Sequence, residues 1–236
     1  MATSPVPERL RVLVASDHLL VADAVRAALA GRGHEALVLA WPDDPRRVPS
    51  QRRGTPAAAD VGLLLSDLDR WSRIRSATQV CEQVRVPWVV LTSAPRGPAW
   101  GAVLAAGCQI VMPASAGLDR VGDTLWSVVR QQLALPPDER AELEAAWRAA
   151  RARRDDAADR LARLTPRERE VLRLMYAGHP VGRIAEISGV APATVRSQVK
   201  AVLRKLDVNS QLAAVAAFDD VLDVLEPRSP ARPQAP

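Results

Sequence analysis

Residues 164–217 read LTPREREVLRLMYAGHPVGRIAEISGVAPATVRSQVKAVLRKLDVNSQLAAVAA, and this stretch decides how the C-terminal part of the chain folds. Thr165 can cap the first helix, and Glu168, three residues on, completes a capping box. Gly178 ends that helix, and Gly189 turns the chain between a second, short helix and a third. The segment therefore predicts consecutive helices with a tight turn before the last of them.

The third of these helices separates apolar and basic side chains onto opposite faces. Its apolar positions, which recur at helical spacing, are Val195, Val199, Val202 and Leu206. The opposite side carries Arg196, Ser197, Lys200 and Arg204. A helix of this width and charge can enter a DNA major groove, where long cations reach guanine acceptors and a short Ser allows close approach. The alternative interpretation is a solvated charged face without a ligand.

This stretch resembles the helix-turn-helix of the LuxR/GerE family, with matching positions in every helix. The matches are LTPREREVL at 164–172, Gly178, Ile184-Ala185, Thr194-Val195-Arg196 and KLDV at 205–208. The resemblance implies that Arg196, Ser197 and Lys200 read bases of double-stranded DNA. It assigns phosphate contacts to Thr194, Arg204 and Lys205.

Two places depart from the family pattern. Ala191 stands where the family usually has a capping Ser, and this change should cost the third helix about 1 kcal/mol. Gly182 and Arg183 replace the family's common Lys-Glu pair in the second helix, so no phosphate contact is assigned there. The reading face keeps its residues.

Composition limits the class of protein. The 236 residues have room for one larger and one smaller domain, each with its own core. Cys81 and Cys108 lack CxxC spacing and sit in apolar contexts, which predicts reduced core thiols. No apolar run approaches 18 residues, so we expect a soluble, cytoplasmic protein without a membrane partner. The sequence has no metal-ligand cluster, no nucleophile with a base and no phosphate-cradling Gly-rich loop, and an enzyme is not expected.

The N-terminal half alternates short apolar runs with helical patterns. The runs predicted as strands are 10–15, 36–40, 61–65, 88–91 and 109–112, and residues 42–59 hold four prolines that leave little room for a helix. Five strands alternating with helices indicate an open parallel sheet with its site at the carboxyl ends of the strands. Those ends carry Asp17, Asp67, Thr92 and Met112.

Residues 10–131 resemble the receiver domain of two-component response regulators. The resemblance makes Asp67 the candidate phospho-acceptor, Thr92 the switch hydroxyl and Met112 the counterpart of the family's Lys. It also makes Asp17 and Asp67 the candidate ligands of Mg²⁺, the one cofactor to consider. Ser16 replaces one acid and Met112 replaces the ammonium that neutralises the phosphoryl oxygens, which predicts an atypical receiver not controlled by phosphorylation. Alternatively, the two Asp side chains are remnants that cap helices.

Residues 136–163 connect the two parts. Apolar residues recur at alternating steps of four and three: Leu143, Trp147, Ala150, Ala157, Leu161 and Leu164, with Arg154 as a charged break. This spacing predicts a helix that pairs with a second copy. The alternative is a helix that packs on its own domain.

Together these features predict an α/β plus all-α protein. It contains a receiver-like (βα)5 parallel sheet (1–135), a helical linker (136–163), a small helix-turn-helix bundle (164–225) and a disordered tail (226–236). The predicted function is sequence-specific transcription regulation by a homodimer bound to DNA, with RNA polymerase as a further candidate partner. Two alternatives stay open: the receiver-like part senses a small molecule or protein, or the chain is an interaction protein with weakened DNA binding.

Overall fold

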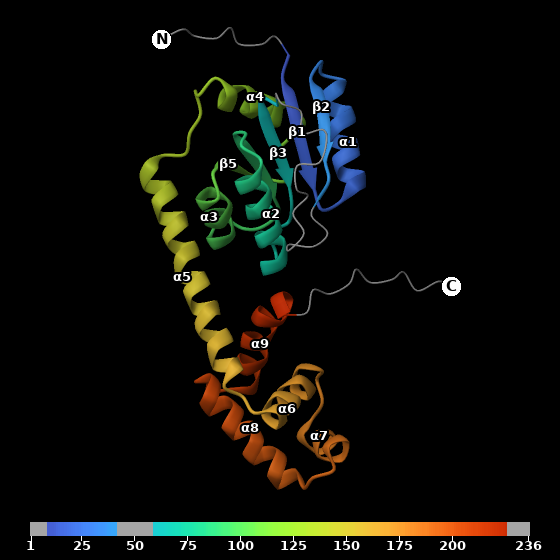
Figure 1. The fold of residues 1–236 in the computed structure, drawn as a ribbon, viewed down its shortest axis with the longest axis vertical. Helices are drawn as coiled ribbons and strands as arrows, with labels where there is room; N and C mark the ends of the chain where they lie inside the picture. The colour runs from blue at the N-terminus through green and yellow to red at the C-terminus, as the bar shows by residue number, and fades with distance from the viewer. Residues whose placement is uncertain (1–8, 42–58, 226–236) are drawn as a thin grey trace, which may run out of the picture. The chain divides into compact units, whose positions relative to one another are not determined.

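The computed structural model describes residues 9–41 and 59–225 (Figure 1). The chain divides into two compact units, Met1–Arg148 and Ala149–Pro236, which are treated separately below. The tail predicted at 226–236 and nearly all of the proline-rich stretch predicted at 42–59 lie outside the described residues.

The first unit is built on a parallel sheet. Its strands are β1 (Arg11–Ser16), β2 (Glu35–Leu39), β3 (Val61–Leu65), β4 (Trp88–Thr92) and β5 (Cys108–Pro113), in the order β2-β1-β3-β4-β5. Every adjacent pair is parallel. The apolar runs of the sequence form these strands because a parallel sheet buries both of its faces. The predicted parallel sheet is confirmed.

Helices cover both faces of this sheet (Figure 1). They are α1 (Leu19–Ala30), α2 (Trp71–Gln83), α3 (Pro98–Ala105) and α4 (Leu118–Val129). Alternate strand residues divide between two cores: Leu13 and Ala15 pack with α2 and α3, whereas Val12 and Val14 pack with α1 and α4. The carboxyl ends of the strands therefore stay open between the two helical layers.

Both cysteines lie in the core that contains α2 and α3. Cys81 and Cys108 are buried free thiols, as predicted. Burial raises the pKa of both thiols, so neither is a ready nucleophile.

The long helix α5 (Pro137–Ala162) begins as part of the first unit. Arg140 donates hydrogen bonds to the carbonyl oxygens of Leu104 (3.0 Å) and Cys108 (2.8 Å), at the end of α3 and the start of β5. Leu143 is buried in the core that contains α2 and α3. The ring of Trp147 lies 4.9 Å from that of Trp71. The first half of α5 is therefore a packed layer of the receiver-like unit.

The second half of α5 belongs to the other unit, which favours the alternative of a helix that packs within its own chain. Leu161 is buried there together with Leu164, and Ala157 packs against the same cluster. The apolar positions at both ends of the predicted pairing stripe, including Leu143 in the first unit, are thus covered by their own units. Heptad spacing specifies which side of a helix is apolar, but not whether a second copy or the same chain covers it.

The second unit is a small helical bundle. It contains α6 (Pro166–Tyr176), α7 (Val181–Ser188), α8 (Pro192–Leu206) and α9 (Gln211–Leu225). The predicted capping box is present: the Thr165 hydroxyl accepts from the Glu168 backbone N–H, and the Glu168 carboxylate accepts from the Thr165 N–H at 2.8 Å. The predicted fold class, a parallel α/β unit followed by a helical helix-turn-helix unit, is confirmed. None of the described helices is both long and apolar enough to span a membrane.

Candidate functional site

Helix α8 is held by one buried stripe. Its four apolar residues are at most 5% exposed: Val195, Val199, Val202 and Leu206. They pack in two small cores, one shared with α6 and α7 and the other with α6 and α9. This burial fixes the rotation of α8 about its axis, and the opposite face must point away from the bundle.

That outer face of α8 carries the residues that the sequence singles out. Thr194, Arg196, Ser197, Lys200 and Arg204 are all exposed. Within the described parts of the chain, neither Lys200 nor the guanidinium of Arg196 or Arg204 pairs with a carboxylate within 4.0 Å. The Ser197 hydroxyl donates to the Ala193 carbonyl at 3.2 Å and so stays close to the helix surface. We call these five residues the α8 face. Its cations lie around the short side chain of Ser197.

Lys205 differs from its predicted role. Its ammonium lies 2.6 Å from the Glu168 carboxylate and 3.4 Å from the Arg163 carbonyl oxygen, and the side chain is only 29% exposed. This lysine joins the end of α8 to the start of α6. Lys205 therefore stabilises the bundle, and we do not propose it as a phosphate contact.

The turn before α8 is held from α6. Gly189 has a φ of +63°, which a glycine adopts without strain. The guanidinium of Arg167 donates to the Ser188 carbonyl oxygen at 2.7 Å and pairs with Glu170 at 2.6 Å. Sequence reasoning missed this role of Arg167, because its partner carbonyl is a backbone atom on another helix. Ala191 is the N-cap of α8 and supplies no side-chain cap, as expected.

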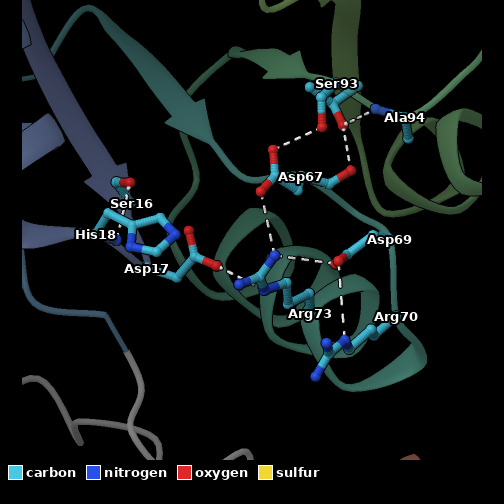
Figure 2. Close-up of polar contacts among 10 residues, drawn as sticks. Ser16, Asp17, His18, Asp67, Asp69, Arg70, Arg73, Ser93 and Ala94 are labelled. Atoms are coloured by element: carbon cyan, nitrogen blue, oxygen red, sulfur yellow. Dashed lines mark hydrogen bonds and ion pairs between the residues drawn. The ribbon is translucent and has the colours of Figure 1, made fainter. Parts of the chain in front are cut away.

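Acidic side chains that follow β1 and β3 meet in a cluster, which we call the acidic cluster, beside the end of β4 (Figure 2). The guanidinium of Arg73, on α2, is shared by three carboxylates: Asp17 at 3.0 Å, Asp67 at 3.2 Å and Asp69 at 3.0 Å. Ser93 donates to the other oxygen of Asp67 at 2.6 Å. Sequence reasoning brought Asp17 and Asp67 together correctly, but it missed Arg73 and Ser93.

Thr92 and Met112 do not act on the Asp67 carboxylate. Thr92 is buried, and its hydroxyl donates to the Asp67 backbone carbonyl at 2.8 Å while accepting from the Ala94 N–H at 3.1 Å. Met112 is buried in the core that contains α1 and α4. Ser16 accepts from the His18 N–H at 3.1 Å. A threonine that already holds backbone atoms and a buried thioether cannot neutralise a phosphoryl group.

The cluster does not fit the Mg²⁺ that its carboxylates suggest. The sequence predicts Asp17 and Asp67 as ligands, but one oxygen of each already contacts Arg73. Among the described residues, no group of three His, Cys, Asp or Glu side chains is arranged to hold a metal ion. The permanently charged guanidinium already balances both carboxylates.

Comparison with known proteins gives a family for the second unit. Residues 162–218 match the family "Bacterial regulatory proteins, luxR family". This segment contains α6, α7 and α8, and it carries the helix-turn-helix of that family. No curated protein matches the chain.

Solved structures of response regulators resemble the whole chain at low identity. The response regulator StyR is 24% identical over 88% of this chain and 97% of its own, with a TM-score of 0.35. The response regulator RcsB in a DNA complex is 21% identical over 91% and 100%, with a TM-score of 0.40. FixJ from B. japonicum is 19% identical over 89% and 96%, with a TM-score of 0.38. At these TM-scores the likeness carries no argument about mechanism.

Proposed function

We propose that the protein is a DNA-binding transcription regulator that reads sequence with α8. The observation that carries the proposal is the α8 face, which is exposed and cationic, on a helix whose opposite side is fully buried. The family match of residues 162–218 supports the same function. A charged helix face without a ligand would not account for this family match. DNA binding is therefore favoured over that alternative.

The geometry of α8 suits a major groove. Its 15 residues span about 22 Å at about 1.5 Å per residue, and the groove is about 12 Å wide. Arg196 and Lys200 are one turn apart with Ser197 between them, so all three can reach base edges. Thr194 and Arg204 lie toward the two ends of the helix, where the phosphate backbones pass.

Lys200→Ala tests the proposed base contacts. Duplexes selected from a random pool by the wild-type protein would give a binding sequence, and both proteins would then be titrated against all single-base variants of it. We expect Lys200→Ala to relax the preference at one base pair and to cost about 1–3 kcal/mol. Arg151→Ala is the control, because it removes one exposed cation from α5 in the same unit. If Lys200→Ala changes neither affinity nor preference, the α8 face does not read DNA.

A two-fold dimer would bring two α8 helices to a palindromic site. Both ends of the α5 stripe are covered within the chain, and α9 is the other predicted surface. Leu212 is 79% exposed there, Ala216 is exposed, and Val215 is partly buried against the bundle core. We propose α9 as the contact between copies, with Leu212 on its exposed side.

The receiver-like unit would then act without phosphorylation. Arg73 and Ser93 hold the two carboxylate oxygens of Asp67, and Met112 offers no charge. The proposed function in transcription agrees with the predicted cytoplasmic location. It also agrees with RNA polymerase as a further partner. Genome-wide mapping of bound sites separates this function from the alternative of an interaction protein, which would show no enriched sequence.

A further inference from the structure

The Arg73 guanidinium lies at the centre of the acidic cluster. Its Nε faces Asp17 from the end of β1, and its Nη1 faces both Asp67 and Asp69 from the segment after β3 (Figure 2). The Arg73 side chain is 29% exposed and that of Asp17 only 13%. One helix thus supplies a cation to acids from two separate strand ends.

Burial makes this cation necessary. The Asp17 carboxylate is largely removed from water, and an unpaired charge in that position is costly. A guanidinium suits the task better than an ammonium, because its planar fork can face carboxylates in two directions at once. Arg70 adds a weaker contact at 3.8 Å to Asp69, on the outer side of the cluster.

Asp67 is engaged at every oxygen. Arg73 takes one carboxylate oxygen, Ser93 the other, and the Thr92 hydroxyl takes the backbone carbonyl. Mg²⁺ needs near-octahedral oxygen ligation at about 2.1 Å. It could reach Asp17 and Asp67 together only by displacing the guanidinium.

We propose that Arg73 is the built-in cation of this cluster and takes the place of a divalent metal. The receiver-like unit is consequently held in one metal-independent state. Arg73 lies in the first unit, so the role proposed for it is independent of DNA binding by α8. It also differs from an ordinary ion pair, because removal of the guanidinium should leave a set of carboxylates that accepts a metal.

The test compares melting temperatures of the full-length chain with and without Mg²⁺. Arg73→Ala should melt about 4–8 °C below the wild type in metal-free buffer, since Asp17 loses its counter-charge. About 10 mM MgCl2 should restore roughly half of that loss, whereas NaCl of equal ionic strength should restore much less. The wild type should not respond to Mg²⁺. Arg75→Ala, an exposed arginine on the same helix, should behave as the wild type.

Each outcome decides the proposal. Mg²⁺ rescue confined to Arg73→Ala supports it. A Mg²⁺ response of the wild type, an Arg73→Ala variant as stable as the wild type, or one that is destabilised but indifferent to Mg²⁺ overturns it. If Arg73→Ala does not fold, Arg73→Gln removes the charge but keeps a shorter side chain with an amide N–H donor, and it should show the same Mg²⁺ rescue. Calorimetric titration of the wild type with MgCl2 should give no binding heat, and a measurable heat would also overturn the proposal.

Discussion

The ammonium of Lys205 lies 2.6 Å from the carboxylate of Glu168. Glu168 is also the third residue of α6, where its carboxylate accepts from the Thr165 N–H at 2.8 Å. One buried carboxylate thus closes the capping box of α6 and ties down the end of α8. The orientation of the α8 face depends on this pair as well as on the apolar stripe.

We expect the second unit to lose stability in mild acid because of Glu168. Burial would raise the pKa of its carboxyl, but the hydrogen bonds from Lys205 and Thr165 outweigh burial and lower it. A carboxyl with a lowered folded-state pKa stabilises the fold above its unfolded pKa. That contribution disappears as the pH falls through the folded pKa. The melting temperature should therefore fall below about pH 4.5.

Glu168→Gln is the variant that isolates this effect. It should cost about 1–2 kcal/mol at neutral pH, since a charge-assisted hydrogen bond to a largely buried group is lost. The difference from the wild type should shrink toward low pH. Glu170→Gln, which disturbs only an exposed pair with Arg167, is the control. If the wild type and Glu168→Gln lost stability in parallel on acidification, the stabilising role of the Glu168 carboxylate would be refuted.

A glycine in α3 marks where α5 packs on the receiver-like unit. A Cβ atom on Gly101 would lie 2.0 Å from the Leu143 carbonyl oxygen, whereas one on Gly122 in α4 would meet nothing within 4 Å. We expect Gly101→Ala to destabilise the first unit by about 2–3 kcal/mol, because backbone must move. Gly122→Ala should stabilise it by about 0.5–1 kcal/mol. Denaturant unfolding measures both, and equal effects of the two substitutions would contradict the packing of α5 on α3.

The sheet could be predicted because its determinants are local. The run 61–65 is the strand Val61–Leu65 as predicted, and the other four strands differ by only one or two residues at their ends. Apolar runs of this length suit a strand buried on both faces. Thr165 and Glu168 likewise specify the start of α6 within four residues of sequence.

The acidic cluster and the role of α5 depend on contacts between residues far apart in the sequence. Arg73 meets Asp17 across 56 positions, and Lys205 meets Glu168 across 37, so neither pair has a local signal. The apolar positions of α5 were identified from their periodicity. Only the fold shows that Leu143 packs in one unit and Leu161 in the other. A buried stripe and a pairing stripe have the same sequence pattern.

Arg204 is predicted to contact phosphate without reading sequence. Arg204→Ala should weaken binding to all duplexes alike, because one cation fewer releases one counterion fewer. The slope of log affinity against log salt should flatten by about 0.9. Fluorescence anisotropy at several salt concentrations measures the slope, with Arg151→Ala as the charge-matched control. A change of base preference in Arg204→Ala would mean that this residue reads bases instead.

The proposed contact between two copies of the chain lies on α9. Leu212→Asp places a charge on the exposed side of this helix without entering the bundle core, since Leu212 is 79% exposed. We expect this variant to remain monomeric by light scattering at micromolar concentration and to lose affinity for a palindromic site, but not for a half-site. Gln211→Asp is the control on the same turn. A wild type that is monomeric with and without DNA would refute the dimer altogether.

Phosphorylation of Asp67 is not expected to switch the protein. Both carboxylate oxygens of Asp67 are engaged, by Arg73 and Ser93, and the buried Met112 provides no ammonium for a phosphoryl group. Loss of one preorganised charge typically costs about 10²–10³ in rate. A small-molecule acyl phosphate, with Mg²⁺ present, should therefore yield no phosphoprotein by intact mass.

Asp67→Asn extends the same prediction to DNA binding. The amide oxygen can accept from Arg73 and the amide NH2 can donate to the Ser93 hydroxyl, so the cluster should persist with weaker pairing. Affinity for the selected duplex should stay nearly unchanged, because the buried Met112 of β5 carries no charge that could respond to this carboxylate. Asp69→Asn, which removes an equivalent charge from the same guanidinium, is the matched control. A stable, Mg²⁺-dependent phosphorylation of Asp67 that tightens DNA binding would overturn both the prediction and the assignment of an atypical receiver.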